Sequence, residues 1–251
     1  MAPNLLILGG TTGATALCRA LSEAGIAGTV SLAGRVARPV RQPLPLRSGG
    51  FGGVEGLRQY LHDHAITHVV DATHPFAAQM SRNAVNACAA AKVPLIALTR
   101  PPWTPGEGDR WQHVPDIAGA AAALRGPACR VMLAVGRMHL AEFAPNPQHF
   151  YLLRLVDPPE AALPFPGCEV ILDRGPFTVD GDLALMREHR IDLVVSKNSG
   201  GTGAQAKLIA ARQLELPVLM IDRPSLPARR EASGAEEVIA WVAHSGTDLG
   251  V

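Results

Sequence analysis

The chain has 251 residues, of which 47% are hydrophobic, and a formal net charge of +1 at pH 7. This length permits a sizeable core in one or two domains. The near-neutral charge argues against a general nucleic-acid or anionic-membrane binder, because no large basic excess is available. The four cysteines form no CxxC pair, which excludes a zinc ribbon or a thioredoxin-type site. Without a signal-peptide pattern or a run of membrane-spanning length, we expect a soluble cytoplasmic protein.

Short apolar runs alternate with helical patterns along the chain, and most runs end in glycine or polar residues. Runs that are apolar on both faces are typical of parallel strands covered by helices. Strand–helix alternation with short links predicts βαβ units. The expected strands are 5–8, 29–33, 68–70, 131–135, 170–172 and 193–195, and the expected helices are 12–23, 55–64, 76–91, 180–189, 203–214 and 234–243.

The alternation is interrupted at residues 100–109, which contain three prolines and two glycines. Such a segment cannot form a helix or a central strand. We therefore predict a linker between two α/β domains, one spanning residues 1–112 and the other residues 113–251. Ligands of parallel α/β sheets bind outside the carboxyl ends of the strands, so the polar residues that follow the runs are the candidate site residues.

The first candidate is the turn that follows the run 5–8, with the sequence Gly9-Gly10-Thr11-Thr12-Gly13. A strand, a glycine turn and a helix can hold a phosphate with backbone N–H groups. The match to GxGxxG is partial, because Leu8 occupies the first glycine position. A tight turn without a ligand is the alternative interpretation.

The end of the second run indicates which dinucleotide would bind. An acidic residue there holds the ribose of NAD, whereas an arginine accommodates the 2′-phosphate of NADP. This chain has Gly34-Arg35, with Arg38 close by and no acid. The pattern favours NADPH, and two solvated surface arginines are the alternative.

Two further segments extend the predicted cofactor site. Residues 48–53 contain four glycines, which indicates a backbone-lined loop, although composition alone equally fits a flexible one. Residues 71–77 follow a strand next to the first strand, where a nicotinamide ribose would lie. His74 is a candidate proton donor there, and a capping or packed histidine is the alternative.

The motifs ILGGTT, SLAGR, GGFGGVEGL, DATHPFA, RLVDPP, ILDRGPFT and SKNSGGT together resemble the precorrin-6A reductase family of cobalamin biosynthesis, from Leu6 to about Pro224. The resemblance implies two Rossmann-like domains with parallel sheets, an interdomain cleft, and NADPH-dependent reduction of one double bond of precorrin-6A to give precorrin-6B. Relatives commonly carry an acidic residue where this chain has Gly13.

The second half suits such a tetrapyrrole, because several cations and backbone donors are needed to hold its acetate and propionate groups. Ordinary surface ion pairs are the alternative for each arginine. No metal site, nucleic acid or membrane partner is expected. The predicted cofactor-binding residues are Gly9, Gly10, Thr11, Thr12, Gly13, Gly34, Arg35, Gly50, Phe51, Gly52, Asp71, Ala72, Thr73 and His74, and the predicted substrate-binding residues are Arg137, Arg154, Arg174, Lys197, Asn198, Ser199, Gly200, Gly201 and Thr202.

Three other functions fit the same residues less fully. The chain could be an NADPH reductase of a smaller imine or carbonyl, or a two-domain glycosyltransferase that holds a sugar nucleotide with the SKNSGGT loop. A non-catalytic NADPH sensor is the third. The sequence contains no serine–histidine–acid arrangement or paired carboxylates that would indicate hydrolysis.

Overall fold

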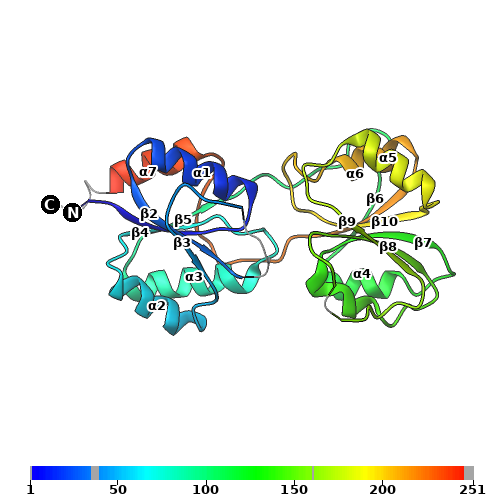
Figure 1. Cartoon of the computed structure of the whole chain (residues 1–251), viewed down its shortest axis with the longest axis horizontal. Coiled ribbons are helices and arrows are strands. Elements are labelled where there is room, and N and C mark those ends of the chain that lie inside the picture. The colour runs from blue at the N-terminus through cyan, green and yellow to red at the C-terminus, as the bar shows by residue number, and fades with distance from the viewer. Residues whose placement is uncertain (1, 35–39, 160, 246–251) are drawn as a thin grey trace. The chain divides into compact units, whose positions relative to one another are not determined.

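The protein forms two compact units, each built on one six-stranded sheet. A computed structural model describes residues 2–34, 40–159 and 161–245. The first unit comprises Met1–Arg100 with Ser225–Val251, and the second comprises Pro101–Pro224. Helices cover both faces of each sheet (Figure 1), and the described strands pair only in parallel. The predicted α/β class with two parallel sheets is confirmed.

The first sheet has the strand order of dinucleotide-binding folds. From one edge it runs β3-β2-β1-β4-β5-β12, which is 3-2-1-4-5-6 when the strands are numbered within the unit. The order reverses between β1 and β4, which are hydrogen-bonded neighbours. The elements of this unit are β1 (Asn4–Leu8), α1 (Thr12–Glu23), β2 (Ala27–Leu32), β3 (Leu46–Ser48), α2 (Gly53–Asp63), β4 (His68–Asp71), α3 (Ala78–Ala91), β5 (Leu95–Leu98), β12 (Arg230–Ala232) and α7 (Ala235–Ser245).

Strand β1 shows why this sheet is buried on both sides. Leu5 and Ile7 pack in the cluster that α1 and α7 cover, and Leu6 and Leu8 pack in the cluster of α2 and α3. Successive side chains of a strand point to opposite faces, so an uninterrupted apolar run is what a strand between two helical layers requires.

The second sheet has the same order around its own first strand. It runs β9-β8-β7-β10-β11-β6, and the order reverses between β7 and β10. The sixth position is filled by β6, which precedes β7 in the chain. The elements are β6 (Arg110–Val114), α4 (Ile117–Ala123), β7 (Arg130–Ala134), the 3-10 helix η1 (Arg137–Phe143), β8 (Phe150–Leu155), β9 (Cys168–Leu172), α5 (Val179–Glu188), β10 (Leu193–Lys197), α6 (Ala206–Gln213) and β11 (Pro217–Ile221).

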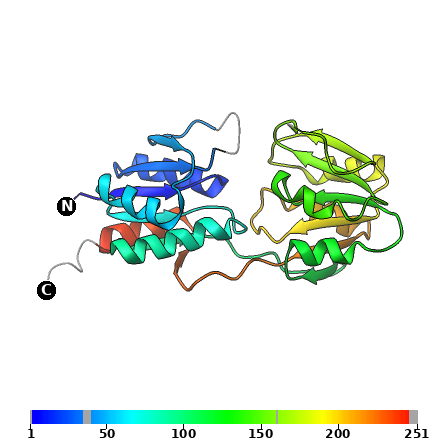
Figure 2. The same ribbon diagram turned by 90° about the horizontal axis from the view of Figure 1, so that it is seen from below.

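The two units are joined by two connections, near residues 100 and 225 (Figure 2). After the second connection the chain returns to the first sheet, where β12 pairs with β5. This differs from the predicted division into 1–112 and 113–251. The boundary lies at 100/101 because Trp103 packs in the core of the second unit and β6 pairs with β11. The first boundary falls within the predicted linker segment 100–109, but the sequence did not predict that residues 225–251 belong to the first unit.

The expected helices all form, with small shifts at their ends. The helix predicted over 76–91 starts at Ala78, because the preceding residues form a turn in which the Ala77 N–H donates to the His74 carbonyl (2.7 Å). The helix predicted over 203–214 starts at Ala206. Among the described helices, none has both the length and the apolar character that a membrane-spanning segment needs.

Candidate functional site

In the first unit, the loops after β1 and β4 are tied together at the point where the strand order reverses. The Thr11 hydroxyl donates to the Ala72 carbonyl (2.9 Å) and accepts the Ala14 N–H (3.1 Å). Thr11 is therefore the N-cap of α1 and also the bridge between the two predicted cofactor loops. The structure thus brings residues 9–13 and 71–74 together.

The three glycines of the first loop differ in backbone conformation and in the space around them. A Cβ on Gly9 would lie 2.9 Å from Val30 Cγ2, so Gly9 is required by packing against β2. Gly10 has φ +110°, which side-chain-bearing residues rarely adopt, and a Cβ there would meet nothing within 4 Å. Gly13 has ordinary contacts and lies within α1. Gly10 is therefore the position where exposed backbone can approach a ligand.

The loops after β2 and β3 also meet. A Cβ on Gly34 would lie 3.2 Å from Ser48 Oγ, which places the end of β2 beside the glycine loop 48–53. Gly52 is left-handed (φ +80°) and is the N-cap of α2. Arg35, the residue predicted to select NADPH, lies outside the described residues, as does Arg38.

Arg47 supports this glycine loop and was missed by the sequence analysis. Its guanidinium donates to Ser31 Oγ (2.7 Å) and to the carbonyls of Gly49 (3.0 Å) and Gly50 (3.2 Å). It also lies 3.9 Å from the centroid of the Phe51 ring. Its position directly before Ser-Gly-Gly-Phe is the signal that could have identified it.

Asp71, predicted to contact the cofactor, is a buried structural carboxylate in this structure. Its side chain is 1% exposed and accepts the N–H and hydroxyl of Thr73 (3.1 and 2.7 Å), the hydroxyl of Ser81 (2.6 Å) and the guanidinium of Arg229 (2.5 Å). These four donors occupy the carboxylate. Asp71 therefore stabilises the conformation of the loop 71–77. Through Arg229 it also links this loop to the C-terminal segment that begins at Ser225.

His74 lies half-buried in the same loop. Its Nδ1 accepts the Phe76 N–H (3.2 Å). A neutral ring with this hydrogen bond carries its proton on Nε2. The geometry therefore selects one tautomer, and protonation at Nδ1 would break the bond to Phe76.

In the second unit, the loops after β7 and β10 meet at the corresponding reversal. Gly136 has φ +80°, and a Cβ there would lie 3.9 Å from the Nζ of Lys197. Arg137 begins η1 and is exposed, and Arg174 is exposed in the loop after β9. Lys197, expected after the strand, is the last residue of β10.

Arg154 is held by partners inside the second unit. Its guanidinium pairs with Asp182 in the first turn of α5 and lies 4.1 Å from the centroid of the Phe177 ring. The two side chains are 11% and 2% exposed. Within the part of the chain that the structure describes, Asp182 Oδ2 and Arg154 Nε have no hydrogen-bond partner.

The loop that follows Lys197 is held from behind by the linker segment and by Arg223. The side chain of Asn198 accepts the Trp103 N–H (2.7 Å) and donates to the Trp103 carbonyl (2.9 Å). Arg223 donates to the carbonyls of Asn198 (2.9 Å) and Ser199 (3.1 Å). The Trp103 indole N–H donates to the Gly201 carbonyl (2.7 Å). Asn198, predicted to bind substrate, thus uses its amide to shape the loop, whereas Thr202 is exposed.

Lys207, in the first turn of α6, is a buried cation that the sequence analysis did not identify. It is 8% exposed, and its Nζ donates to the Ala204 carbonyl (2.6 Å). Burial lowers the pKa of Lys207 to about 8; the positive charges of Arg154 and Lys197 also lower it, and Asp182 opposes them. A lysine inside the apolar run Ala206–Ala211 is the signal that could have revealed it.

The cysteines offer no activated thiol. All four are free, and burial raises the pKa of Cys18 to about 11 and that of Cys88 to about 12. Burial also raises the pKa of Cys129 and of Cys168. The described residues contain no group of histidine, cysteine and acidic side chains that could hold a metal ion.

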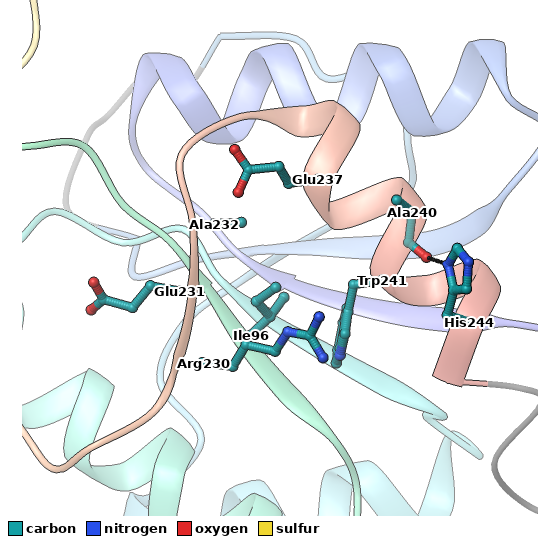
Figure 3. Close-up of a pocket in the computed structure, with 8 residues that line it drawn as sticks. All are labelled: Ile96, Arg230, Glu231, Ala232, Glu237, Ala240, Trp241 and His244. Carbon is teal, nitrogen blue, oxygen red and sulfur yellow. Dashed lines mark hydrogen bonds between the residues drawn. The ribbon is translucent and has the colours of Figure 1, made fainter.

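A surface hollow lies along the outer edge of the first sheet, between β12 and α7 (Figure 3). Two strands, β5 and β4, separate this edge from β1, so the hollow is not part of the loop cluster above. Glu237 already accepts the Ser233 N–H (3.2 Å) and hydroxyl. The hollow is lined by Ile96, Arg230, Glu231, Ala232, Glu237, Ala240, Trp241 and His244.

Comparisons with known proteins agree along almost the whole chain. A family profile described as "Precorrin-6x reductase CbiJ/CobK" matches residues 4–243. A precorrin-6A reductase of Rhodobacter capsulatus is 56% identical over 99% of both chains. A cobalt-precorrin-6A reductase of Priestia megaterium is 29% identical over 94% of this chain and 96% of the relative. A solved structure of a "CobK precorrin-6A reductase" superimposes with a TM-score of 0.94 over 97% of both chains, at 56% identity.

Proposed function

The chain belongs to the precorrin-6x reductase family CbiJ/CobK and has the activity of a precorrin-6A reductase of cobalamin biosynthesis; from that premise we propose that it reduces precorrin-6A to precorrin-6B with NADPH. We further propose that the first unit binds NADPH and that the second unit binds the carboxylates of the tetrapyrrole. The 56% identity to a precorrin-6A reductase over 99% of both chains is the observation that carries the function.

The residues of the first unit fit a dinucleotide. The strand order 3-2-1-4-5-6 has its ligand crevice where the order reverses, and the loops after β1 and β4 meet there. The open backbone at Gly10 and the N-terminus of α1 would hold the pyrophosphate. Arg35 remains the residue predicted to contact the 2′-phosphate. When bound, NADPH supplies a hydride.

The second unit fits a polyanion. Lys197, Arg137 and Arg174 lie at or beyond the carboxyl ends of its strands, where cations are needed for a ring fringed with carboxylates. Metal-free precorrin-6A is favoured over its cobalt complex, because identity falls from 56% with a precorrin-6A reductase to 29% with a cobalt-precorrin-6A reductase.

His74 remains the proposed proton donor for the carbon next to the one that is reduced. The bond from the Phe76 N–H to Nδ1 leaves Nε2 as the protonated ring nitrogen, so Nε2 is the atom from which His74 would deliver a proton. Replacing His74 with asparagine is expected to lower kcat by about a hundredfold, with little change in substrate affinity. Normal turnover by this variant would assign the proton to water or to the substrate.

The test is anaerobic incubation of the purified chain with precorrin-6A and NADPH, while the absorbance of both chromophores is followed. We expect NADPH oxidation and loss of the precorrin-6A spectrum in equal amounts. Oxidation of NADPH with a simple imine or ketone, but not with precorrin-6A, would contradict the proposal.

A further inference from the structure

In the loop between β10 and α6, residues 198–204, four backbone carbonyls accept hydrogen bonds from side chains. Arg223 donates to the carbonyls of Asn198 and Ser199, and the Trp103 indole N–H donates to the carbonyl of Gly201. The Nζ of Lys207 donates to the carbonyl of Ala204. Two of these three donors are cations, and they come from three different segments: the linker, α6, and the chain after β11.

This arrangement fixes where the amides of the loop point. In a trans peptide the C=O and the following N–H point in opposite directions. The N–H groups of Gly200 and Thr202 therefore face away from Arg223 and Trp103. Gly200 and Gly201 have φ of +67° and +73°, and consecutive N–H groups in such turns form anion-binding concavities.

The backbone of the loop at Gly200 packs closely against Pro101 and Arg223. A Cβ on Gly200 would lie 2.1 Å from the Pro101 carbonyl oxygen and 2.5 Å from Arg223 Nη2. Lys207 Nζ also lies 5.1 Å from the centroid of the Trp103 ring, so the indole contacts both the loop and the lysine. The donors and the loop thus form one packed assembly.

We propose that Lys207, with Trp103 and Arg223, is a positioning residue that holds the loop 198–204 with its N–H groups toward a carboxylate of the tetrapyrrole, and that its positive charge strengthens this anion site together with Lys197. This inference rests on the proposed function, because that function assigns the tetrapyrrole to the second unit. None of the three residues needs to touch the substrate.

The charge of Lys207 provides a readout that a purely structural role would not change. The ionisable groups facing it are Asp182 from α5, Arg154 from β8 and Lys197 from β10. Because burial lowers the pKa of Lys207 to about 8, the lysine is charged below this pH and neutral above it. Affinity for a carboxylate is therefore expected to fall as the pH rises through about 8.

The experiment measures binding of precorrin-6A, without NADPH, by anaerobic absorbance titration between pH 6.5 and 9.5. The variants are Lys207→Met, which keeps the length of the side chain but removes its charge and its donor, and Trp103→Phe, which removes the indole N–H. Arg187→Met is the matched control, since it removes an exposed cation from the last turn of α5.

At pH 7 we expect Lys207→Met to bind precorrin-6A roughly tenfold more weakly, without the fall in affinity near pH 8. Trp103→Phe is expected to weaken precorrin-6A binding but to retain the decrease in affinity near pH 8. Arg187→Met is expected to bind precorrin-6A as the unchanged chain does, at every pH. NADPH affinity should stay the same in all variants. Unchanged precorrin-6A affinity and pH profile in Lys207→Met would overturn the inference, and so would an equal loss of NADPH affinity, which would place a nucleotide phosphate on the loop.

Amide hydrogen exchange separates this inference from the proposed function, because it needs no substrate. With a carbonyl released, the amides of residues 199–204 should exchange faster in Lys207→Met and Trp103→Phe than in Arg187→Met. Faster exchange in a chain that does not reduce precorrin-6A would support the positioning role and contradict the function. Unchanged exchange in both variants would overturn the positioning role alone.

Discussion

The two units share a strand order but differ in the chemistry of their carboxyl edges. The first unit presents glycine backbone, hydroxyls and a helix N-terminus around Gly10 and Thr11. The second presents cations, with Lys197 beside Gly136 and Lys207 behind the following loop. A shared fold fixes where a ligand can bind, and the side chains at the edge decide which ligand it is.

The buried carboxylates show the same difference. Asp71 in the first unit accepts four protein donors, one of them from Arg229. Asp182 in the second unit pairs with Arg154, and its Oδ2 has no hydrogen-bond partner among the described residues. Lys207 also lies within the electrostatic range of Asp182. The first carboxylate stabilises structure, whereas the second is outnumbered by cations at an edge suited to anions.

The largest expected effect comes from breaking the first of these pairs. Asp71→Asn should lower the free energy of unfolding by about 3–5 kcal/mol, because it removes the buried carboxylate that pairs with Arg229 and leaves that guanidinium only the exposed Glu231, 3.5 Å away. Urea denaturation followed by circular dichroism measures this. Asp63→Asn, an exposed carboxylate in the same unit, is the control and should change stability by less than about 0.5 kcal/mol. A loss below about 1 kcal/mol for Asp71→Asn would show that the pair is not a structural anchor.

The next effect concerns the assignment of the nucleotide to the first unit. Arg35→Ala should weaken NADPH binding by about 1.5–3 kcal/mol and leave NADH nearly unchanged, because only NADPH carries the 2′-phosphate. Titration calorimetry with both cofactors tests this. An equal loss for both would show that Arg35 does not read the phosphate.

A matched pair of glycine substitutions sharpens the same assignment. Gly10→Ala should cost about 1–2 kcal/mol of stability because of its positive φ, and it should weaken NADPH binding because it adds a Cβ to the open backbone. Gly13→Ala should instead stabilise the fold by about 0.4–1 kcal/mol, because the helix accepts alanine. Cofactor binding that is equally strong in both variants would place the pyrophosphate elsewhere.

The last expected effect is also a gain in stability, and it concerns the second unit. The pKa of Lys207 falls from 10.5 to about 8 on folding, so folding disfavours its charged form. Below pH 8 the charged lysine destabilises the native state relative to the unfolded chain. This destabilisation decreases as the pH rises from about 8 to 10.5. At pH 7, Lys207→Met should therefore stabilise the chain by about 1–2 kcal/mol, after the lost hydrogen bond is counted. A variant that is less stable than the unchanged chain at pH 7 would mean that Lys207 is held more favourably than its burial indicates.

The sequence predicted what local patterns encode and missed what distant segments supply. The run Leu5–Leu8 and the turn after it indicated a strand and a binding loop, because apolar spacing and glycine act locally. Arg229, which donates to Asp71, and Trp103, which donates to the loop 198–204, are far away in the chain from the groups that accept from them. No spacing rule connects those positions. Asp71 and Asn198 were therefore predicted to bind ligands, although in the structure their polar atoms are used by the protein.

The return of the chain to its first sheet sets an order of assembly during synthesis. Strand β12, the sixth strand of the first sheet, and α7, which covers part of its core, emerge from the ribosome only after all of Pro101–Pro224 has been made. Until then β5 is an open edge, Asp71 lacks Arg229, and the apolar face under α7 is uncovered. We therefore expect the nascent first unit to stay incompletely folded at a stage when the second unit can already fold, because all of its strands have been made. A chain truncated before Ser225 should accordingly expose that face and aggregate, although it retains every residue predicted to bind the nucleotide.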